Sequence, residues 1–195
     1  MFDSILELDY QLFFLINGAW TNSFFDWILP LFRNKYFWFP LYLFLIVFFI
    51  VNYKKRGLVV ILFMLLAVAL SDQISSSIVK PIFQRIRPCN EESISDLVRN
   101  LVRCGSGYSF TSSHAANHFS IAVFLIMLFF RKYKWLLPLG ICWAASISYA
   151  QIYVGVHYPL DILAGAFMGS VIGLLTGWFS VKVFFPFHVI NYSQY

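Results

Sequence analysis

Residues 57–79 read GLVVILFMLLAVALSDQISSSIV, an apolar run in which Asp72 is the one charged side chain. A helix needs roughly 20 apolar residues to cross the hydrocarbon core of a bilayer, which is about 30 Å thick. The whole chain has this character, because 60% of its 195 residues are hydrophobic and 12% are charged. A soluble fold of this length cannot bury so much apolar surface. The sequence therefore predicts an integral membrane protein of the all-α class.

Four further apolar stretches predict a polytopic transmembrane helical bundle of about five spans. They lie at residues 36–52, 113–130, 135–152 and 160–183. Residues 1–35 are also apolar, but Asn17 and Asp26 interrupt them, while Leu12 and Ile16 recur at helical spacing. We expect two short helices there that lie in the membrane interface, with a sixth crossing as the alternative.

These stretches predict a single domain over residues 1–195. It consists of the interfacial helices, a transmembrane core at 36–183 with an outer loop at 80–112, and a tail at 184–195. No cleavable signal peptide is expected, because Asp3 and Glu7 stand where a signal would carry Lys or Arg.

Two short basic connections indicate the orientation. Lys54-Lys55-Arg56 follows the first span, and Arg131-Lys132-Tyr133-Lys134 follows the third. Short basic loops mark the cytoplasmic side, so we expect an inner (plasma) membrane protein whose loop 80–112 and turn 153–159 share the extracytoplasmic face. The net charge of +5 fits this role, and no basic recognition face suggests nucleic acid as a partner.

Two polar clusters flank the outer loop. The first, Lys80-Pro81-Ile82-Phe83-Gln84-Arg85-Ile86-Arg87-Pro88, ends the second span, and Pro81 should make the helix break or restart near Lys80. Alone, this cluster is typical of a basic interface anchor. The second, Tyr108-Ser109-Phe110-Thr111-Ser112-Ser113-His114, opens the third span as an N-cap, where free N–H groups and the helix dipole suit an anion.

The third cluster joins the fourth and fifth spans. Pro159 suits a first helical turn, which places Asp161 in that turn and His157 just before it. The carboxylate can fix one imidazole nitrogen and leave the other as a nucleophile. An isolated His–Asp pair near a membrane surface is usually structural. The predicted topology, however, brings all three clusters to one surface, where cations and helix N–H groups could hold a phosphoryl group.

At this point the sequence resembles the type-2 phosphatidic acid phosphatase family, whose site design is shared with vanadium haloperoxidases. Lys80 to Arg87-Pro88 matches the first family motif, Lys, six residues, Arg-Pro. The second motif, Pro-Ser-Gly-His, is represented by 111–114. The third, Ser-Arg, five residues, His, three residues, Asp, keeps His157 and Asp161.

The resemblance implies a role for each matched residue. His157 would accept the phosphoryl group and form a phosphohistidine intermediate. Asp161 would orient His157, and His114 would be the general acid. The implied phosphate ligands are Lys80, Arg87, Ser112, Ser113 and the residue at position 151. No metal cluster is suggested and no cofactor is expected.

The third motif departs from the family, because Ala150-Gln151 replaces Ser-Arg. A neutral amide lacks both the charge and the bidentate fork of a guanidinium. We therefore expect a working but handicapped site, or a site in which Arg85 or another outer-loop arginine supplies the missing charge.

Other polar residues have weaker interpretations. Cys89 and Cys104 face an oxidising compartment in this topology, so a disulfide that pins the outer loop is expected. Asn117 and His118 are expected to form interhelical hydrogen bonds, and Asp72 to pair with an arginine or a serine network. The remaining loop charges, Arg85, Glu91, Glu92, Asp96, Arg99 and Arg103, are interpreted as surface charges, some with headgroup contacts.

The expected function is a metal-independent membrane lipid phosphatase acting on undecaprenyl diphosphate or on lipid A phosphates. Phosphatidylglycerol phosphate is an alternative substrate. A protein of a different functional class is also an alternative. The chain would then bind or transport a lipid phosphate and would have lost turnover because Gln151 replaces the family arginine. The bilayer and its lipid phosphate are the expected partners, and the sequence does not indicate an oligomeric state.

Overall fold

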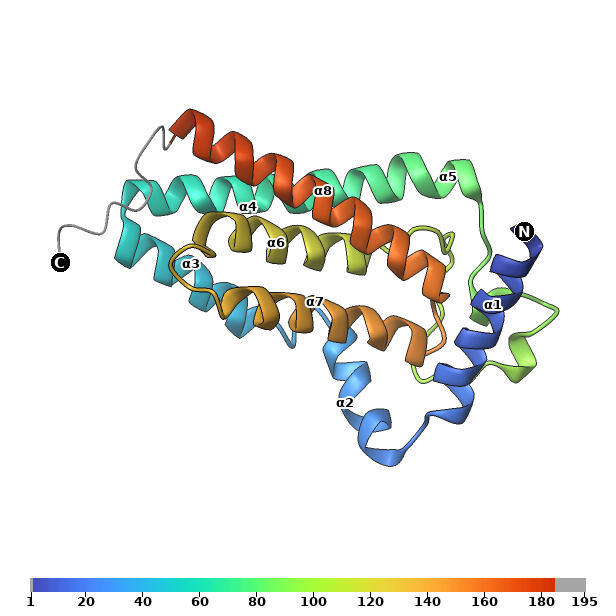
Figure 1. Ribbon diagram of the computed structural model, residues 1–195. Coiled ribbons are helices and arrows are strands. Elements are labelled where there is room, and N and C mark those ends of the chain that lie inside the picture. The colour runs from blue at the N-terminus through green and yellow to red at the C-terminus, as the bar shows by residue number, and fades with distance from the viewer. Residues whose placement is uncertain (1, 185–195) are drawn as a thin grey trace.

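The computed structural model describes residues 2–184, and every regular element in that range is helical (Figure 1). The α-helices are α1 (Phe2–Phe14), α2 (Ser23–Arg33), α3 (Phe39–Tyr53), α4 (Lys55–Gln73), α5 (Lys80–Phe83), α6 (Ser113–Phe129), α7 (Leu136–Tyr153) and α8 (Pro159–Phe184). Two π-helical segments, η1 (Leu15–Ala19) and η2 (Ile74–Val79), and two 3₁₀ turns, η3 (Pro88–Asn90) and η4 (Ser95–Leu97), complete the set. The all-α prediction is confirmed. The expected tail 184–195 lies outside the described residues apart from Phe184.

Five apolar helical segments form the bundle. Three of them, Lys55–Phe83, Leu136–Tyr153 and Pro159–Val183, are long and apolar enough to cross a membrane, while Phe39–Tyr53 and Ser113–Phe129 are shorter. Exposed Leu, Phe, Ile and Trp side chains cover the outer surface of the bundle. Such a surface requires lipid rather than water around it.

The second span changes from π-helical to α-helical geometry at Lys80, where α5 starts, so the predicted break or restart near Lys80 takes the form of a restart. The helix continues through η2 and α5 to Phe83 and ends at Gln84, whose φ of 48° is left-handed. In regular α geometry the Pro81 ring would meet a carbonyl one turn earlier. The π-helical segment avoids this, because the Lys80 N–H bonds to the Ser75 carbonyl, five residues back, in a wider turn.

Helices α6 and α8 run side by side from the same end of the bundle (Figure 1). A row of glycines on α8 faces backbone carbonyls of α6. A Cβ atom at Gly169 would lie 2.1 Å from the Ala116 oxygen, and Cβ atoms at Gly165 and Gly173 would lie 2.5 Å from the oxygens of Ser112 and Ser120. We call this row the glycine seam. It lets the two backbones approach more closely than any side chain would allow.

The N-terminal helices lie at the end of the bundle where α5 ends and α8 begins (Figure 1). α1 (13 residues) continues without a break into the five residues of η1, and α2 has 11 residues. Neither is among the helices of the described chain that are long and apolar enough to cross a membrane. Asn17, completely buried, fixes them in place because its amide donates to the carbonyls of Arg99 and Tyr153.

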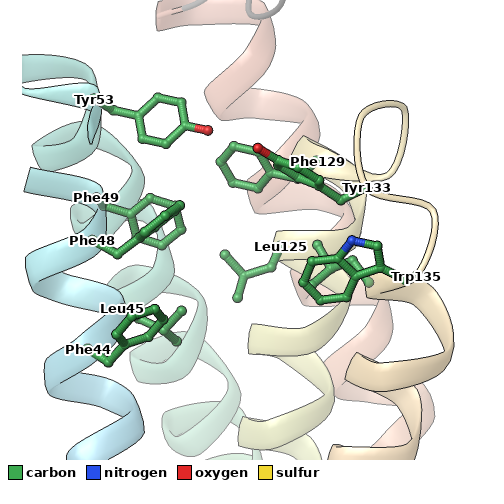
Figure 2. Close-up of a pocket in the computed structure, with 10 residues that line it drawn as sticks. Phe44, Leu45, Phe48, Phe49, Tyr53, Leu125, Phe129, Tyr133 and Trp135 are labelled. Atoms are coloured by element: carbon green, nitrogen blue, oxygen red, sulfur yellow. The ribbon is translucent and has the colours of Figure 1, made fainter. Parts of the chain in front are cut away.

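Towards the opposite end of the bundle the interior is apolar. A cavity of about 310 Å³ lies between α3, α6 and α7, lined by rings such as Phe49 and Phe129 (Figure 2). These two rings stack with centroids 5.6 Å apart. This end carries the basic connections, and the polar clusters meet at the other end.

Candidate active site

The structure brings the three polar clusters together at one end of the bundle. The loop after α5, the start of α6 and the turn between α7 and α8 contact one another there. Arg87 donates to the Val156 carbonyl at 3.2 Å, and the Ser112 N–H donates to the Asp161 carbonyl at 3.0 Å. Lys80, Arg87, His114, His157 and Asp161 are therefore gathered at one surface, as the topology predicted.

His157 sits in a tight turn between α7 and α8. Gly155 reverses the chain with φ +88°, and the Gln151 carbonyl accepts the N–H groups of Val156 and His157. The histidine is buried, and its Nδ1 lies 3.4 Å from Oδ2 of Asp161 and 3.4 Å from Oγ of Ser109. Burial lowers the pKa of His157 to about 4, although Asp161 acts in the opposite direction. The ring is therefore neutral at neutral pH.

Asp161 is held by several donors. Its Oδ2 accepts the Tyr158 N–H at 2.8 Å and the hydroxyl of Ser109, and its Oδ1 accepts Arg85 at 2.9 Å. The carboxylate is fully buried, so these charge-assisted bonds keep it ionised and fixed beside the histidine. Ser109 lies inside the second sequence cluster but was assigned no role from the sequence.

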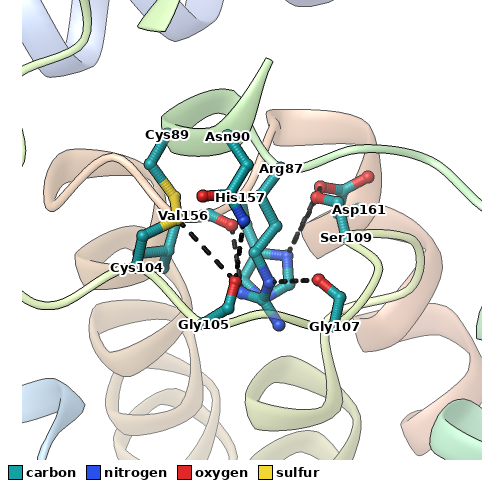
Figure 3. The surroundings of a disulfide bond; sticks show 10 residues. All are labelled: Arg87, Cys89, Asn90, Cys104, Gly105, Gly107, Ser109, Val156, His157 and Asp161. Carbon is teal, nitrogen blue, oxygen red and sulfur yellow. Dashed lines mark hydrogen bonds and ion pairs between the residues drawn. A yellow bond between two sulfur atoms is a disulfide. The ribbon is translucent and has the colours of Figure 1, made fainter. Parts of the chain in front are cut away.

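Arg87 lies on the other side of the histidine ring, where Nη1 is 3.3 Å from Nε2 of His157 (Figure 3). Its Nε donates to the Gly107 carbonyl at 2.8 Å. Burial and the nearby charge of Arg33 lower the pKa of Arg87. Nδ1 of His157 is thus held beside a carboxylate, while Nε2 lies beside a guanidinium cation.

Lys80 and the start of α6 line the same region. The ammonium of Lys80 donates to the carbonyls of Tyr108, Ser109 and Thr111 at 2.9, 3.3 and 2.7 Å. The lysine thereby holds the loop before α6 against the end of α5. All its donors have protein acceptors, so a phosphate oxygen would have to replace one of them.

Ser112 is the N-cap of α6, and its Oγ accepts the Ala115 N–H at 3.4 Å. Its own N–H is bonded to Asp161, so the predicted phosphate ligand acts here as a cap and a tie to α8. Ser113 bonds through Oγ to Ser75 at 2.9 Å. Ser113 and His114 occupy the first turn of α6, where a backbone N–H has no helical carbonyl before it to bind, so their N–H groups are available to an anion.

Gln151 is completely buried in the last turn of α7. Its Oε1 accepts Nε of Arg33 at 3.2 Å, while its Nε2 has no partner within the described chain. Arg85, which the sequence offered as a substitute for the family arginine, is paired with Asp9 and Asp161 instead. Sequence reasoning did not single out Arg33, because it lies outside every motif.

Two residues near His114 have structural contacts. His118 bonds to the His114 carbonyl and, through Nε2, lies 3.0 Å from the Tyr42 hydroxyl of α3. Asn117 donates to Asp72 of α4 at 3.3 Å. The expected interhelical hydrogen bonds are present, and Asp72 pairs with an amide rather than with an arginine.

The outer loop is tied down more firmly than its charges suggested. Cys89 and Cys104 form a disulfide next to Arg87 (Figure 3). Glu91 accepts the hydroxyls of Tyr10 and Tyr158, and Arg85 stacks on the Tyr158 ring at 3.9 Å. The interpretation of Glu91 and Arg85 as surface charges was therefore wrong, because aromatic residues of α1 and of the turn between α7 and α8 cover them.

Comparison with known proteins agrees with this geometry. The family model described as the PAP2 superfamily matches residues 56–185. A lipid A 4′-phosphatase of Bacteroides thetaiotaomicron is 37% identical over 90% of this chain and 78% of its own length. An undecaprenyl-diphosphatase of Sulfolobus acidocaldarius is 31% identical over 73% of this chain and 63% of its own length.

A solved structure extends the comparison to three dimensions. The crystal structure of Aquifex aeolicus LpxE is 28% identical and superposes with a TM-score of 0.65 over 87% of this chain and 94% of that one. The helical bundle is thus matched by both sequence and structure. The chain belongs to the PAP2 superfamily and is a membrane lipid phosphatase of that type.

Proposed function

We propose that the chain removes phosphate from a lipid A-type substrate without a metal, through a covalent phosphohistidine on His157. The observation that carries the proposal is the setting of that ring. Asp161 and Ser109 hold Nδ1, and Nε2 faces Arg87. A neutral imidazole with one nitrogen fixed and the other beside a cation suits attack on an anionic phosphorus centre.

The reaction has two displacements. Nε2 of His157 forms a bond to phosphorus while the phosphorus–oxygen bond to the lipid breaks, and protonated His114 gives its proton to the leaving oxygen. Water then attacks the phosphohistidine, passes a proton to His114 and releases inorganic phosphate. Lys80, Arg87 and the α6 N-terminus, with the free N–H groups of Ser113 and His114, stabilise the charge on the phosphoryl oxygens.

The relatives support the choice of substrate. The Bacteroides relative, which covers most of this chain, is a lipid A 4′-phosphatase, and this makes a lipid A phosphate the first candidate. Undecaprenyl diphosphate is the second, because another relative is named for that reaction. A disulfide in the loop beside the site supports an oxidising compartment, hence the extracytoplasmic face of the inner membrane.

Phosphate release by purified protein in lipid nanodiscs tests the proposal. Lipid A, undecaprenyl diphosphate and phosphatidylglycerol phosphate are offered separately, with and without EDTA. We expect lipid A to be the best substrate, EDTA to have no effect, and His157→Ala to abolish release. Restoration by a divalent cation after EDTA treatment would contradict metal independence, and no release from any lipid would favour a binding or transport protein.

A further inference from the structure

The contact between Arg33 and Gln151 joins an N-terminal helix to the third motif. Arg33 is the last residue of α2, and α2 packs through Leu29 against Ala150 and Tyr153 of α7. This packing places Arg33 beside Gln151, six residues before His157. The bond from Nε of Arg33 to Oε1 of Gln151, 3.2 Å long, spans 118 residues of sequence.

Arg33 also lies within electrostatic reach of the site. Its charge acts on Arg87 and on His114. Within residues 2–184 no carboxylate forms an ion pair with Arg33 or Arg87, whereas Arg85 has two such partners. Two partly buried guanidinium groups without protein counter-ions repel each other, and an anion between them would relieve that repulsion.

Gln151 adds an independent observation. Its amide is completely buried, yet Nε2 has no hydrogen-bond partner within the described chain. An unpaired buried donor destabilises the folded protein. A phosphate oxygen beside Arg33 would satisfy it.

We propose that Arg33 binds the transferred phosphate in place of the arginine that the family carries at position 151, with Gln151 as its positioning residue. The amide oxygen of Gln151 engages Nε and leaves Nη1 and Nη2 of Arg33 for a two-point contact with phosphate oxygens. The guanidinium that contacts the phosphate thus comes from α2 rather than from α7. The assignment of phosphate as ligand rests on the proposed function, and it replaces the expectation of a handicapped site.

An arginine swap tests the inference. The variants are Arg33→Gln, Gln151→Arg and the double change, with Lys35→Gln as the matched control, since Lys35 is an exposed cation two residues away. The readouts are kcat/KM for phosphate release and the dissociation constant of orthovanadate, a phosphoryl mimic. We expect Arg33→Gln to lower kcat/KM by about 100-fold, as loss of one transition-state donor does, and to weaken vanadate binding.

The double variant should recover at least about tenfold in kcat/KM over Arg33→Gln, because it returns one guanidinium to the site. Gln151→Arg alone should lose activity, since it places a second cation against Arg33. An activity increase in that variant would overturn the proposal, and so would an Arg33→Gln protein that matches Lys35→Gln in both readouts.

One further variant and a binding measurement complete the test. If Arg33→Gln fails to fold, Arg33→Lys takes its place in the test. This variant retains the charge but lacks the planar guanidinium that binds two oxygens at once, so its vanadate affinity should be intermediate. Vanadate binding does not require turnover. If the wild type hydrolyses no lipid but Arg33→Gln still loses vanadate, the proposed function fails while the assignment of Arg33 stands.

Discussion

The Asp9 carboxylate accepts the backbone N–H of Leu160 at 2.7 Å, so a residue of α1 caps the helix that carries Asp161. Its other oxygen binds Arg85, and Arg85 binds Asp161. The N-terminal helix, the outer loop and the start of α8 are thereby joined through one buried chain of charges. Asp9 contributes to the site without belonging to any motif.

Asp9→Asn should destabilise the protein and slow catalysis. The change removes one charge from a buried, hydrogen-bonded chain, and such bonds to charged groups contribute about 1.5–3 kcal/mol. Thermal unfolding in detergent measures the loss, and kcat/KM should fall with it because Arg85 is left with Asp161 alone. Asp3→Asn, an exposed acid on the same helix, is the control. Equal melting temperatures for the two variants would contradict the role of Asp9.

Ser109→Ala should lower kcat by about tenfold with little change in KM. The hydroxyl donates to the Asp161 oxygen that faces His157, so its loss loosens the pair that orients the nucleophile. A tenfold effect corresponds to about 1.4 kcal/mol of transition-state stabilisation. Steady-state kinetics provide the measurement, and Ser93→Ala in the exposed part of the loop provides the control. A change confined to KM would point to substrate contact instead.

The acid limb of the pH–rate profile should lie near pH 4 rather than near 6.5. Burial lowers the pKa of His157 to about 4, so the ring stays neutral and nucleophilic until the pH falls through that value. The profile of kcat/KM reports groups of the free enzyme. Two short-chain lipid phosphates with different phosphate pKa values separate the titration of the enzyme from that of the substrate. A shared limb near pH 6.5 would contradict the prediction.

Cys89→Ser and Cys104→Ser should each destabilise the protein, and the double variant should be no worse than either single one. The disulfide closes a loop with a sequence separation of 15, and in the chain-entropy model a loop of that size contributes about 3 kcal/mol. Activity should also fall, because the bridge anchors the chain beside Arg87. Cys142→Ser, at an exposed free cysteine, is the control. Additive losses in the double variant would argue against the bond.

Sequence was sufficient for the helices and for the ordered motifs, since apolar length and local spacing determine both. It was not sufficient for Asp9, Arg33 and Arg85. Their partners lie 76 to 151 residues away, and only the packed bundle brings them together.

The sequence predicted a break or restart near Lys80, but it did not predict the widened turn through which the helix continues past Pro81. A proline signals a break unless the preceding turn widens, and the sequence of η2 carries no clear mark of such widening. The sequence also failed to predict the partly buried contacts of Glu91. Its two tyrosine partners belong to α1 and to the turn between α7 and α8, both far from it in the sequence.

The glycine seam fixes the position of α8 along α6, and with it the relative positions of the site residues on the two helices. Successive glycines of α8 meet successive carbonyls of α6 at the same interval of four residues, from Gly165 with Ser112 to Gly173 with Ser120. A slide of one residue would drive a side chain into a carbonyl, so the next matching position is a full repeat away, about 6 Å along the axis. His114 and Asp161 therefore cannot drift past each other in small steps.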